Sequence, residues 1–286
     1  MDKRKELDLR KKATQIRKYI IDEVFSAKSG HPGGSLSCTD IFTVLYFDEM
    51  RVDPKNPKCP DRDRFVLSKG HCAPALYATL AVKGFFPEAD LYTFRKVDSY
   101  LEGHPSMSYV PGVDMSTGSL GQGISTAVGM ALAGKIDKKD YRVYSILGDG
   151  ELEEGQVWEA SMAAAHYKLD NLTAFVDYNG LQIDGNITDV MNPEPVADKF
   201  AAFGWNVIVV DGHDHKQIKD AIETAKTVKG KPTMVVCKCT KGKGVSFMEN
   251  NYAWHGTAPN QEQRDKAIEE LDALMAEIDK EIAEEA

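Results

Sequence analysis

The sequence predicts an α/β protein with a doubly wound, mainly parallel sheet and helices on both faces. Two observations predict this class. Short apolar, β-branched runs without polar alternation recur along the chain, as is typical of strands that are covered on both faces. Segments with helical spacing of apolar residues separate these runs, and this order indicates parallel strands joined by right-handed crossovers. At 286 residues, the chain is long enough for a large core.

The first third of the chain is expected to be mainly helical. Residues 3–26 carry apolar residues at helical spacing among charges, and this helix is expected to end before a turn formed by the sequence SGHPGG. Further helices are expected at residues 39–47 and 73–83. Between them, the sequence DRFVLSKGH predicts a short strand at residues 65–67 that leads into a glycine-containing loop.

Alternating strands and helices are expected in the rest of the chain. The further strands are predicted at residues 142–147, 172–177, 206–210 and 233–237, and the helices at residues 153–167, 195–203 and 215–228. Residues 261–283 form an apolar stripe at helical spacing, and the acidic face of this helix is interpreted as solvated. No repeat or linker is evident, so one domain is expected over residues 1–286, with 261–286 as an acidic C-terminal helix.

The charge distribution disfavours a nucleic-acid partner. The chain has 35 basic and 44 acidic residues, for a net charge of −9. Residues 261–286 hold ten of the acidic and three of the basic residues, so the rest of the chain is close to neutral. Because the remaining lysines and arginines are dispersed, no basic surface for nucleic acid is expected.

Neither a membrane partner nor export is expected. No run approaches the ~18 apolar residues of a membrane helix, and the N-terminal sequence lacks the apolar region of a signal peptide. The five cysteines are odd in number and show no C-x-x-C spacing. Reduced thiols and a cytoplasmic location are therefore expected.

Two polar motifs follow neighbouring strands and suggest a metal site. Asp149 lies in the sequence GDG directly after one strand, and Asn179 lies in DYNG after the next. Loops after adjacent parallel strands lie side by side, so a carboxylate and an amide oxygen could meet on one cation, with the oxygen ligands that Mg²⁺ prefers. The alternative, two unrelated turns, stays open on spacing alone.

A loop rich in small residues could bind an anion. Residues 116–123, STGSLGQG, precede a helical run, and amide groups at the start of a helix favour negative charge. The loop does not continue into GK[ST], as a Walker loop does, and it follows no evident strand, which argues against a dinucleotide fingerprint. A flexible connection remains the alternative reading.

Four histidines lie in loops punctuated by glycine or proline: His31, His71, His104 and His255. Loop histidines at the ends of α/β elements are suited to proton transfer and to binding phosphate or hydroxyl oxygens. The other three histidines, His166, His213 and His215, lie in or beside predicted helices and are interpreted as structural or solvated.

Together these motifs resemble the amino-terminal half of transketolase over residues of about 5–260. The matching segments, in the order of the family, are Ser29–Gly33, Ser68–His71, Gly103–Pro105, Thr117–Gly123, Gly148–Gly150, Glu154–Gly155, Asn179–Gly180 and His255–Gly256. The sequence GDG, followed about thirty residues later by Asn, is the general fingerprint of thiamine diphosphate enzymes. The resemblance implies the thiamine-diphosphate-binding fold and, for residues 1–286, its diphosphate-binding domain.

The resemblance also implies a cofactor site. Asp149, Asn179 and the carbonyl of Leu181 would hold Mg²⁺, or Ca²⁺ in its place, and the metal would hold the diphosphate of thiamine diphosphate. The residues implied to line the cofactor are His71, Gly118, Ser119, Leu120, Gly150, Asn179 and His255. Ser119 stands where many relatives have proline, which should leave a backbone contact intact.

Catalytic roles follow from the same resemblance. His31, His104 and His255 would face the sugar, bind its hydroxyls and move protons as the carbon–carbon bond breaks. Glu154 resembles the acid that takes part in a contact network between paired cofactor sites. The implied reaction is transfer of a two-carbon ketol unit from a ketose, by default a pentose phosphate, to an aldose.

A full transketolase is more than twice the length of this chain. The pyrimidine-binding domain and a third domain are missing, and with them the glutamate that activates the aminopyrimidine ring. The chain therefore resembles the N-terminal subunit of a split transketolase, inactive without a separate C-terminal subunit. A heterotetramer of two copies of each subunit is expected, with sugar phosphates as substrates.

Two other functions remain as alternatives. The alpha subunit of a thiamine-dependent 2-oxoacid dehydrogenase also has GDG and a separate partner chain, but it lacks the loop-histidine set. A non-catalytic regulatory subunit that pairs with a full-length enzyme is the second alternative, and the presence of both metal ligands and four loop histidines argues against it.

Overall fold

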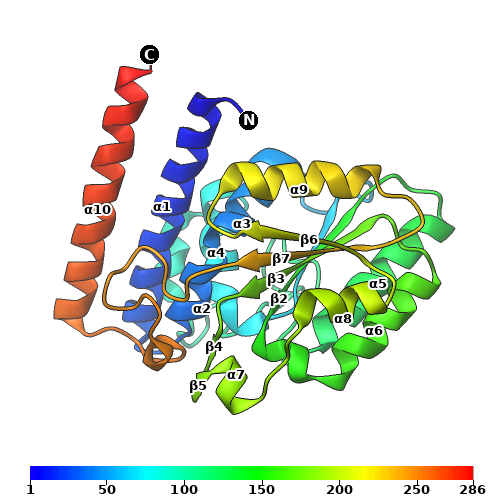
Figure 1. The fold of residues 1–286 in the computed structure, drawn as a ribbon. Coiled ribbons are helices and arrows are strands. Elements are labelled where there is room, and N and C mark those ends of the chain that lie inside the picture. Colours follow the sequence, from blue (N-terminus) through cyan, green and yellow to red (C-terminus); the bar gives the residue numbers. More distant parts are fainter. Residues whose placement is uncertain (286) are drawn as a thin grey trace.

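The structure is a computed structural model that describes residues 1–285; Ala286, the last residue of the expected acidic helix, lies outside the described residues. A five-stranded sheet in the order β1-β2-β3-β7-β6 lies at its centre, and every strand pairing in it is parallel. The strands are β1 (Arg64–Leu67), β2 (Val143–Gly148), β3 (Leu172–Tyr178), β6 (Asn206–Asp211) and β7 (Thr233–Lys238). The expected strands and the predicted fold class are confirmed (Figure 1).

Each face of the sheet packs against its own hydrophobic core. Along β2, Tyr144 and Ile146 belong to one core, whereas Val143 and Leu147 belong to the other. This division follows from the alternation of side chains along a strand. The first core is covered by α1 (Lys3–Ala27), α3 (Thr39–Val44), α4 (Ala73–Lys83) and α9 (His215–Thr227). The second is covered by α5 (Gln122–Ile136), α6 (Gly155–His166) and α8 (Val196–Ala202).

The C-terminal helix, α10 (Gln261–Glu284), lies beside α1 at one side of the molecule (Figure 1). Leu271 on its apolar stripe is fully buried. Its acidic face is only partly solvated, which corrects the prediction: Glu281, for example, accepts two hydrogen bonds of 3.1 Å from Arg10 of α1. Across residues 1–285, no helix combines the length and the apolar character needed to cross a bilayer.

The first helix ends before SGHPGG, as expected, and Ser29–His31 connect it to the next element. The rest of the expected turn, Pro32–Gly34, is instead the start of a helix, α2 (Pro32–Ser37). Proline suits this first position because its φ angle is preset and its missing N–H is not needed there. The glycines that suggested a turn serve close packing. A Cβ on Gly33 would lie 2.8 Å from the Trp254 carbonyl oxygen, and one on Gly34 would lie 2.9 Å from Cys72 Sγ.

Several short elements escaped prediction because they are too brief for a periodic pattern. The expected helix at 39–47 is α3 followed by a π-helical turn, Leu45–Glu49. The expected helix at 153–167 begins later, at Gly155, after a 3-10 turn at Gly150–Glu153. The remaining short elements are 3-10 turns at Gly70–Cys72, Glu88–Thr93 and Tyr252–Trp254, the hairpin of β4 (Leu181–Gln182) and β5 (Gly185–Asn186), and α7 (Ile187–Val190).

Candidate functional site

The candidate site is a cavity of about 250 Å³ at the carboxyl ends of β1, β2 and β3. In open parallel sheets this is the edge at which ligands bind. Gly148 at the end of β2 is paired in register with Asp177 near the end of β3, so the loops that follow meet. The predicted site residues that line the cavity are His31, His71, Gly118, Leu120, Asp149, Gly150, Asn179, Leu181 and His255.

Asp149 and Asn179, the two residues expected to share a metal, are neighbours: the Asp149 carboxylate contacts the backbone of Asn179. Asp149 is 3% exposed, and its Oδ2 accepts hydrogen bonds from the backbone N–H groups of Asn179 (2.9 Å) and Gly180 (2.6 Å). Its Oδ1 accepts from the N–H of Gly150 at 2.9 Å. Burial, with a further contribution from the charge of Asp177, raises the pKa of Asp149 to about 6. A cation beside the carboxylate would stabilise its ionised form.

The third expected ligand, the Leu181 carbonyl, follows the same loop. Asn179 Nδ2 donates to Asp177 at 3.1 Å, and its Oδ1 accepts from the N–H of Leu181 at 3.2 Å. The Leu181 carbonyl oxygen accepts a hydrogen bond of 2.8 Å from Nζ of Lys241. The three expected ligands therefore lie in two adjacent loops, after β2 and after β3, that hydrogen bonds join.

Lys241 is a site residue that the sequence analysis missed. It is 2% exposed, lines the cavity, and contacts both the Leu181 carbonyl and Nδ1 of His255, the latter at 3.1 Å. Burial, followed by the charge of Lys69, lowers the pKa of Lys241. The sequence could have indicated Lys241 only through its position, just beyond the carboxyl end of the strand at residues 233–237. Its neighbouring residues do not distinguish it from the charged residues that are dispersed over the surface.

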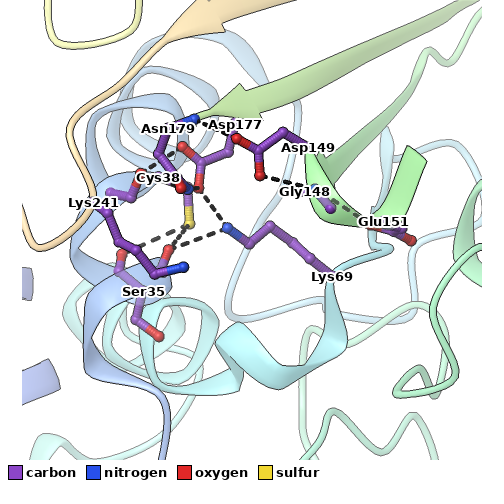
Figure 2. Close-up of polar contacts among 12 residues, drawn as sticks. Ser35, Cys38, Lys69, Gly148, Asp149, Glu151, Asp177, Asn179 and Lys241 are labelled. Carbon is purple, nitrogen blue, oxygen red and sulfur yellow. Dashed lines mark hydrogen bonds and ion pairs between the residues drawn. The ribbon is translucent and has the colours of Figure 1, made fainter. Parts of the chain in front are cut away.

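A buried ion pair forms the floor beneath the expected metal ligands (Figure 2). Lys69 Nζ donates to Oδ2 of Asp177, and Ser37 Oγ donates to Oδ1 of the same carboxylate. The exposed fractions of the Lys69 and Asp177 side chains are 2% and 0%. Burial, the largest single influence, acts to lower the pKa of Lys69, but Asp177 together with Cys72 and Cys38 holds that pKa well above its usual value. This pairing offsets the cost of burying each charge alone.

Glu151 joins the three loops that surround the cavity. Its Oε1 accepts from Ser68 Oγ after β1 and from the N–H of Gly121 before α5, and its Oε2 accepts from the N–H of Gly148 on β2. Ser68 Oγ in turn accepts from the N–H of Ile124 on α5. The N–H groups of Gly121 and Ile124, at the start of the helix that was expected to bind an anion, are thus already hydrogen-bonded within the chain.

Close packing fixes the loop at residues 116–123. This packing argues against the alternative interpretation of the loop as a flexible connection. Gly118 has φ +154°, and a Cβ there would lie 3.1 Å from the ring of His104. A Cβ on Gly70 would lie 2.6 Å from the backbone nitrogen of Gly118. Gly118 and Leu120 line the cavity, whereas Ser119 between them does not.

Three of the four loop histidines, His31, His71 and His255, line the cavity, and His104 lies beside them but outside the lining. The rings of His71 and His255 stack with centroids 5.2 Å apart. The ring centroid of His31 lies 5.2 Å from that of His71, 5.4 Å from that of His255 and 6.5 Å from that of His104. The sequence could identify these histidines as a set, and the fold brings them together from four separate segments.

Three of these imidazoles have lowered pKa values, so they are neutral near pH 7 and able to accept a proton. Burial, followed by His71, lowers the pKa of His31 to about 4. Burial, followed by the Lys241 ammonium, lowers the pKa of His255 to about 3. The pKa of His104 is lowered by burial and by the charge of Arg95.

Other residues singled out in the sequence lie outside the cavity lining. Glu154 is exposed at the start of α6, beside Gly121. His166 is exposed at the end of α6. His213 and His215 both contact the carboxylate of Asp40, as the structural reading expected; His215 is buried and His213 is partly exposed.

Comparisons with known proteins agree with this geometry. The family described as “Transketolase, thiamine diphosphate binding domain” matches residues 9–281. The 6-deoxy-6-sulfo-D-fructose transketolase subunit SqwG of Clostridium sp. (strain MSTE9) is 48% identical over 93% of this chain and 97% of that protein. One of the apulose-4-phosphate transketolase subunits of Phocaeicola vulgatus is 46% identical over 93% of this chain and 94% of that protein.

Longer relatives are matched over part of their length. Human transketolase is 42% identical over 94% of this chain but only 43% of its own length. The crystal structure of transketolase from Campylobacter jejuni superposes with a TM-score of 0.87 at 34% identity, over 96% of this chain and 47% of that one. The chain therefore spans less than half of these longer relatives.

Proposed function

This chain belongs to the transketolase family, and from that premise we propose that it is the N-terminal, cofactor-anchoring subunit of a split transketolase. The observation that carries the proposal is the cavity at the sheet edge. There, one buried carboxylate, one amide oxygen and one backbone carbonyl adjoin three histidines of the lining, His31, His71 and His255, and the ring of His104 lies next to that of His31. We further propose that residues 1–286 act as one diphosphate-binding domain.

The residues present fit thiamine diphosphate and a divalent metal. Two buried polar atoms of cavity-lining residues, His31 Nδ1 and Gln182 Nε2, have no hydrogen-bond partner among residues 1–285. A Cβ on Gly150 would lie 3.3 Å from Gln182 Oε1, so glycine keeps that wall open. The pKa of Asp149, raised to about 6, marks a carboxylate that would gain from a cation.

We assign the metal to Asp149, Asn179 and the carbonyl of Leu181, an all-oxygen set of the kind that Mg²⁺ and Ca²⁺ prefer. No group of three or more His, Cys, Asp and Glu side chains capable of holding a metal occurs in residues 1–285. A mixed set completed by diphosphate oxygens and water does not require such a group. Lys241 beside Leu181 would add positive charge toward the diphosphate.

Thiamine diphosphate, when bound, supplies the carbanion chemistry that breaks and forms carbon–carbon bonds. The residues of this chain anchor and orient that cofactor and handle protons. We assign the binding of sugar hydroxyls and the acceptance of a hydroxyl proton to His31, His104 and His255, and contact with the cofactor to His71. Their proximity and their lowered pKa values support these roles.

We propose that catalysis requires a second polypeptide carrying the remaining domains of a transketolase. Similarity over nearly the whole length of two proteins named as subunits supports this division. A two-by-two heterotetramer is the assembly we propose, with exposed Glu154 in the contact between paired sites.

We propose that the ketose substrate is either a pentose phosphate or one of the less common ketoses. The similar subunits are named for 6-deoxy-6-sulfo-D-fructose and for apulose 4-phosphate. A substrate panel should therefore contain both compounds beside xylulose 5-phosphate.

Reconstitution tests the proposal. The chain and a candidate C-terminal partner are purified separately, supplied with thiamine diphosphate and Mg²⁺, and assayed for ketol transfer alone and mixed. We expect activity from the mixture and from neither chain alone. Full activity of the chain by itself would contradict the split assignment.

The same assay discriminates the alternatives. Oxidative decarboxylation of a 2-oxoacid by the mixture, without ketol transfer, would identify the dehydrogenase subunit. Failure of the isolated chain to bind Mg²⁺ with thiamine diphosphate or pyrophosphate, combined with a rate effect on a full-length transketolase, would identify a regulatory subunit.

A further inference from the structure

A second polar network lies behind the cavity, where α1, α3 and the start of α9 meet. Its centre is Asp40 of α3, which is 3% exposed. Arg17 of α1 donates to Asp40 Oδ2 at 2.5 Å, and the same oxygen contacts His213 Nδ1 at 2.7 Å. His215 Nε2 lies 3.2 Å from the other carboxylate oxygen. The cavity lining described above includes none of these side chains.

The hydrogen bonds of His213 fix its tautomer. Its Nε2 lies 2.8 Å from the backbone nitrogen of Thr240, which can only donate. Nε2 must therefore be the unprotonated, accepting nitrogen. The proton then lies on Nδ1, which donates to Asp40. His213 is thus a neutral link between a buried carboxylate and the backbone of another segment.

That segment carries a residue of the cofactor site. Thr240 directly precedes Lys241, whose ammonium reaches the Leu181 carbonyl at 2.8 Å. On the other side of Lys241, the N–H of Gly242 donates to the Gly33 carbonyl at 2.9 Å. His213 is the side chain that holds the N-terminal side of this turn.

The turn has little freedom once both anchors are in place. Gly242 has φ +79°, and a Cβ there would lie 2.3 Å from the Met248 carbonyl oxygen. A lysine side chain loses much conformational entropy when it is fixed, so the placement of the Lys241 ammonium depends on a backbone that is already fixed.

We propose that His213 is a positioning residue for the cofactor site: by accepting the Thr240 N–H, it holds the backbone that places the Lys241 ammonium beside the Leu181 carbonyl. Asp40, itself held by Arg17, selects the tautomer that makes this acceptance possible. The identity of the group that Lys241 meets, a metal-bound diphosphate, rests on the proposed function; the link from His213 to Lys241 does not.

Two substitutions separate the two hydrogen bonds of His213. In His213→Gln, the side-chain oxygen takes roughly the place of Nε2 and can still accept from Thr240. In His213→Asn, the shorter amide can reach Asp40 but not Thr240. The matched control is His215→Asn, which alters the other imidazole on Asp40 and leaves the Thr240 contact untouched.

Three measurements on the full chain report the effect: amide hydrogen exchange at Thr240, the acylation rate of Lys241, and the affinity for inorganic pyrophosphate with Mg²⁺. For His213→Asn we expect exchange and acylation to accelerate about tenfold and affinity to fall about tenfold, as for loss of one buried hydrogen bond. His213→Gln should restore all three toward the wild-type values, and His215→Asn should leave them unchanged.

The outcomes discriminate clearly. Wild-type acylation of Lys241 in His213→Asn, or equal impairment in His213→Gln, overturns the inference. If the wild-type chain fails to bind pyrophosphate with Mg²⁺, the proposed function fails, while exchange and acylation still decide the role of His213. Should His213→Asn not fold, ¹⁵N shifts of the wild-type imidazole decide instead: we expect an unprotonated Nε2, and a protonated Nε2 at pH 7 contradicts the inference.

Discussion

Two aspartates of this chain are equally buried, each 3% exposed, but differ in what surrounds them. Asp40 contacts an arginine and two histidines, and although burial alone would raise its pKa, these partners hold that pKa well below its usual value. Asp149 receives only backbone N–H groups and faces a second carboxylate, and its pKa rises to about 6. Charged side chains of the described chain therefore stabilise the ionised form of Asp40, whereas the surroundings of Asp149 disfavour its ionised form.

This difference indicates that Asp149, unlike Asp40, lowers the stability of the folded chain in its ionised form. A buried carboxylate without a counter-charge is costly, and such perturbed groups gather at functional sites. The cavity contains further incomplete partnerships, among them the unpartnered Nδ1 of His31. Variants of the two aspartates should therefore respond in opposite ways.

The largest effect is expected for Asp149→Ala. Removal of the proposed metal ligand should lower the affinity for thiamine diphosphate with Mg²⁺ by more than about 100-fold, because even outer partners of a metal site contribute about 10–100-fold. The stability of the metal-free chain should fall less than in Asp40→Ala: the N–H groups of Gly150, Asn179 and Gly180 lose their acceptor, but a carboxylate that is costly to bury is also removed. Calorimetric titration and thermal unfolding measure the two quantities. Normal cofactor affinity in this variant, with the partner subunit present, would refute the metal assignment.

Asp40→Ala should reverse that pattern. It leaves Arg17 buried at 5% exposure without its carboxylate, and breaking a buried pair in this way costs about 3–5 kcal/mol. Denaturant unfolding of the metal-free chain provides the measurement. A loss below about 1 kcal/mol would show that the comparison between the two aspartates is wrong.

A smaller effect is expected from the histidines, which should make the stability of the chain depend on pH. The pKa of His31 is about 4 and that of His255 about 3 in the folded chain, both below the 6.5 of a free imidazole. The unfolded chain therefore binds more protons below pH 6.5. Stability from these groups is complete above that pH and declines as the pH falls through the range down to about 3.

NMR titration of the imidazole C–H signals checks this directly. The signals of His31 and His255 should titrate well below pH 6. A midpoint near 6.5 for His31 would mean that its ring is more solvated than the cavity geometry indicates.

The sequence could predict the sheet and much of the candidate site for a physical reason. Continuous apolar runs mark buried strands, and loops after adjacent parallel strands must meet, which brought Asp149 and Asn179 together from spacing alone. Lys241 and His213 could not be found in this way. Their roles depend on contacts between segments far apart in the chain, and a lysine in TKGKG or a histidine in DGHDH carries no local pattern that distinguishes it from a surface residue.

The same limit applies to α2 and to the acidic helix. Glycine twice in succession suggests a turn at HPGG, because the pattern cannot show that Trp254 and Cys72 approach so closely that glycine is required. The acids of α10 look solvated in the sequence because their basic partners lie about 270 residues earlier, as for Arg10 and Glu281.

The smallest effect is expected at the surface, where an ion pair joins α1 to α10. Lys18 Nζ lies 2.5 Å from Asp272 Oδ1, as close as Arg17 is to Asp40, but the exposed fractions of the two side chains are 32% and 55%. Water and salt screen such a pair, so Asp272→Asn should cost less than about 1 kcal/mol. Denaturant unfolding at low and high salt measures it, and the small loss should shrink further at high salt. A cost comparable to that of Asp40→Ala would mean that geometry, rather than burial, sets the strength of these pairs.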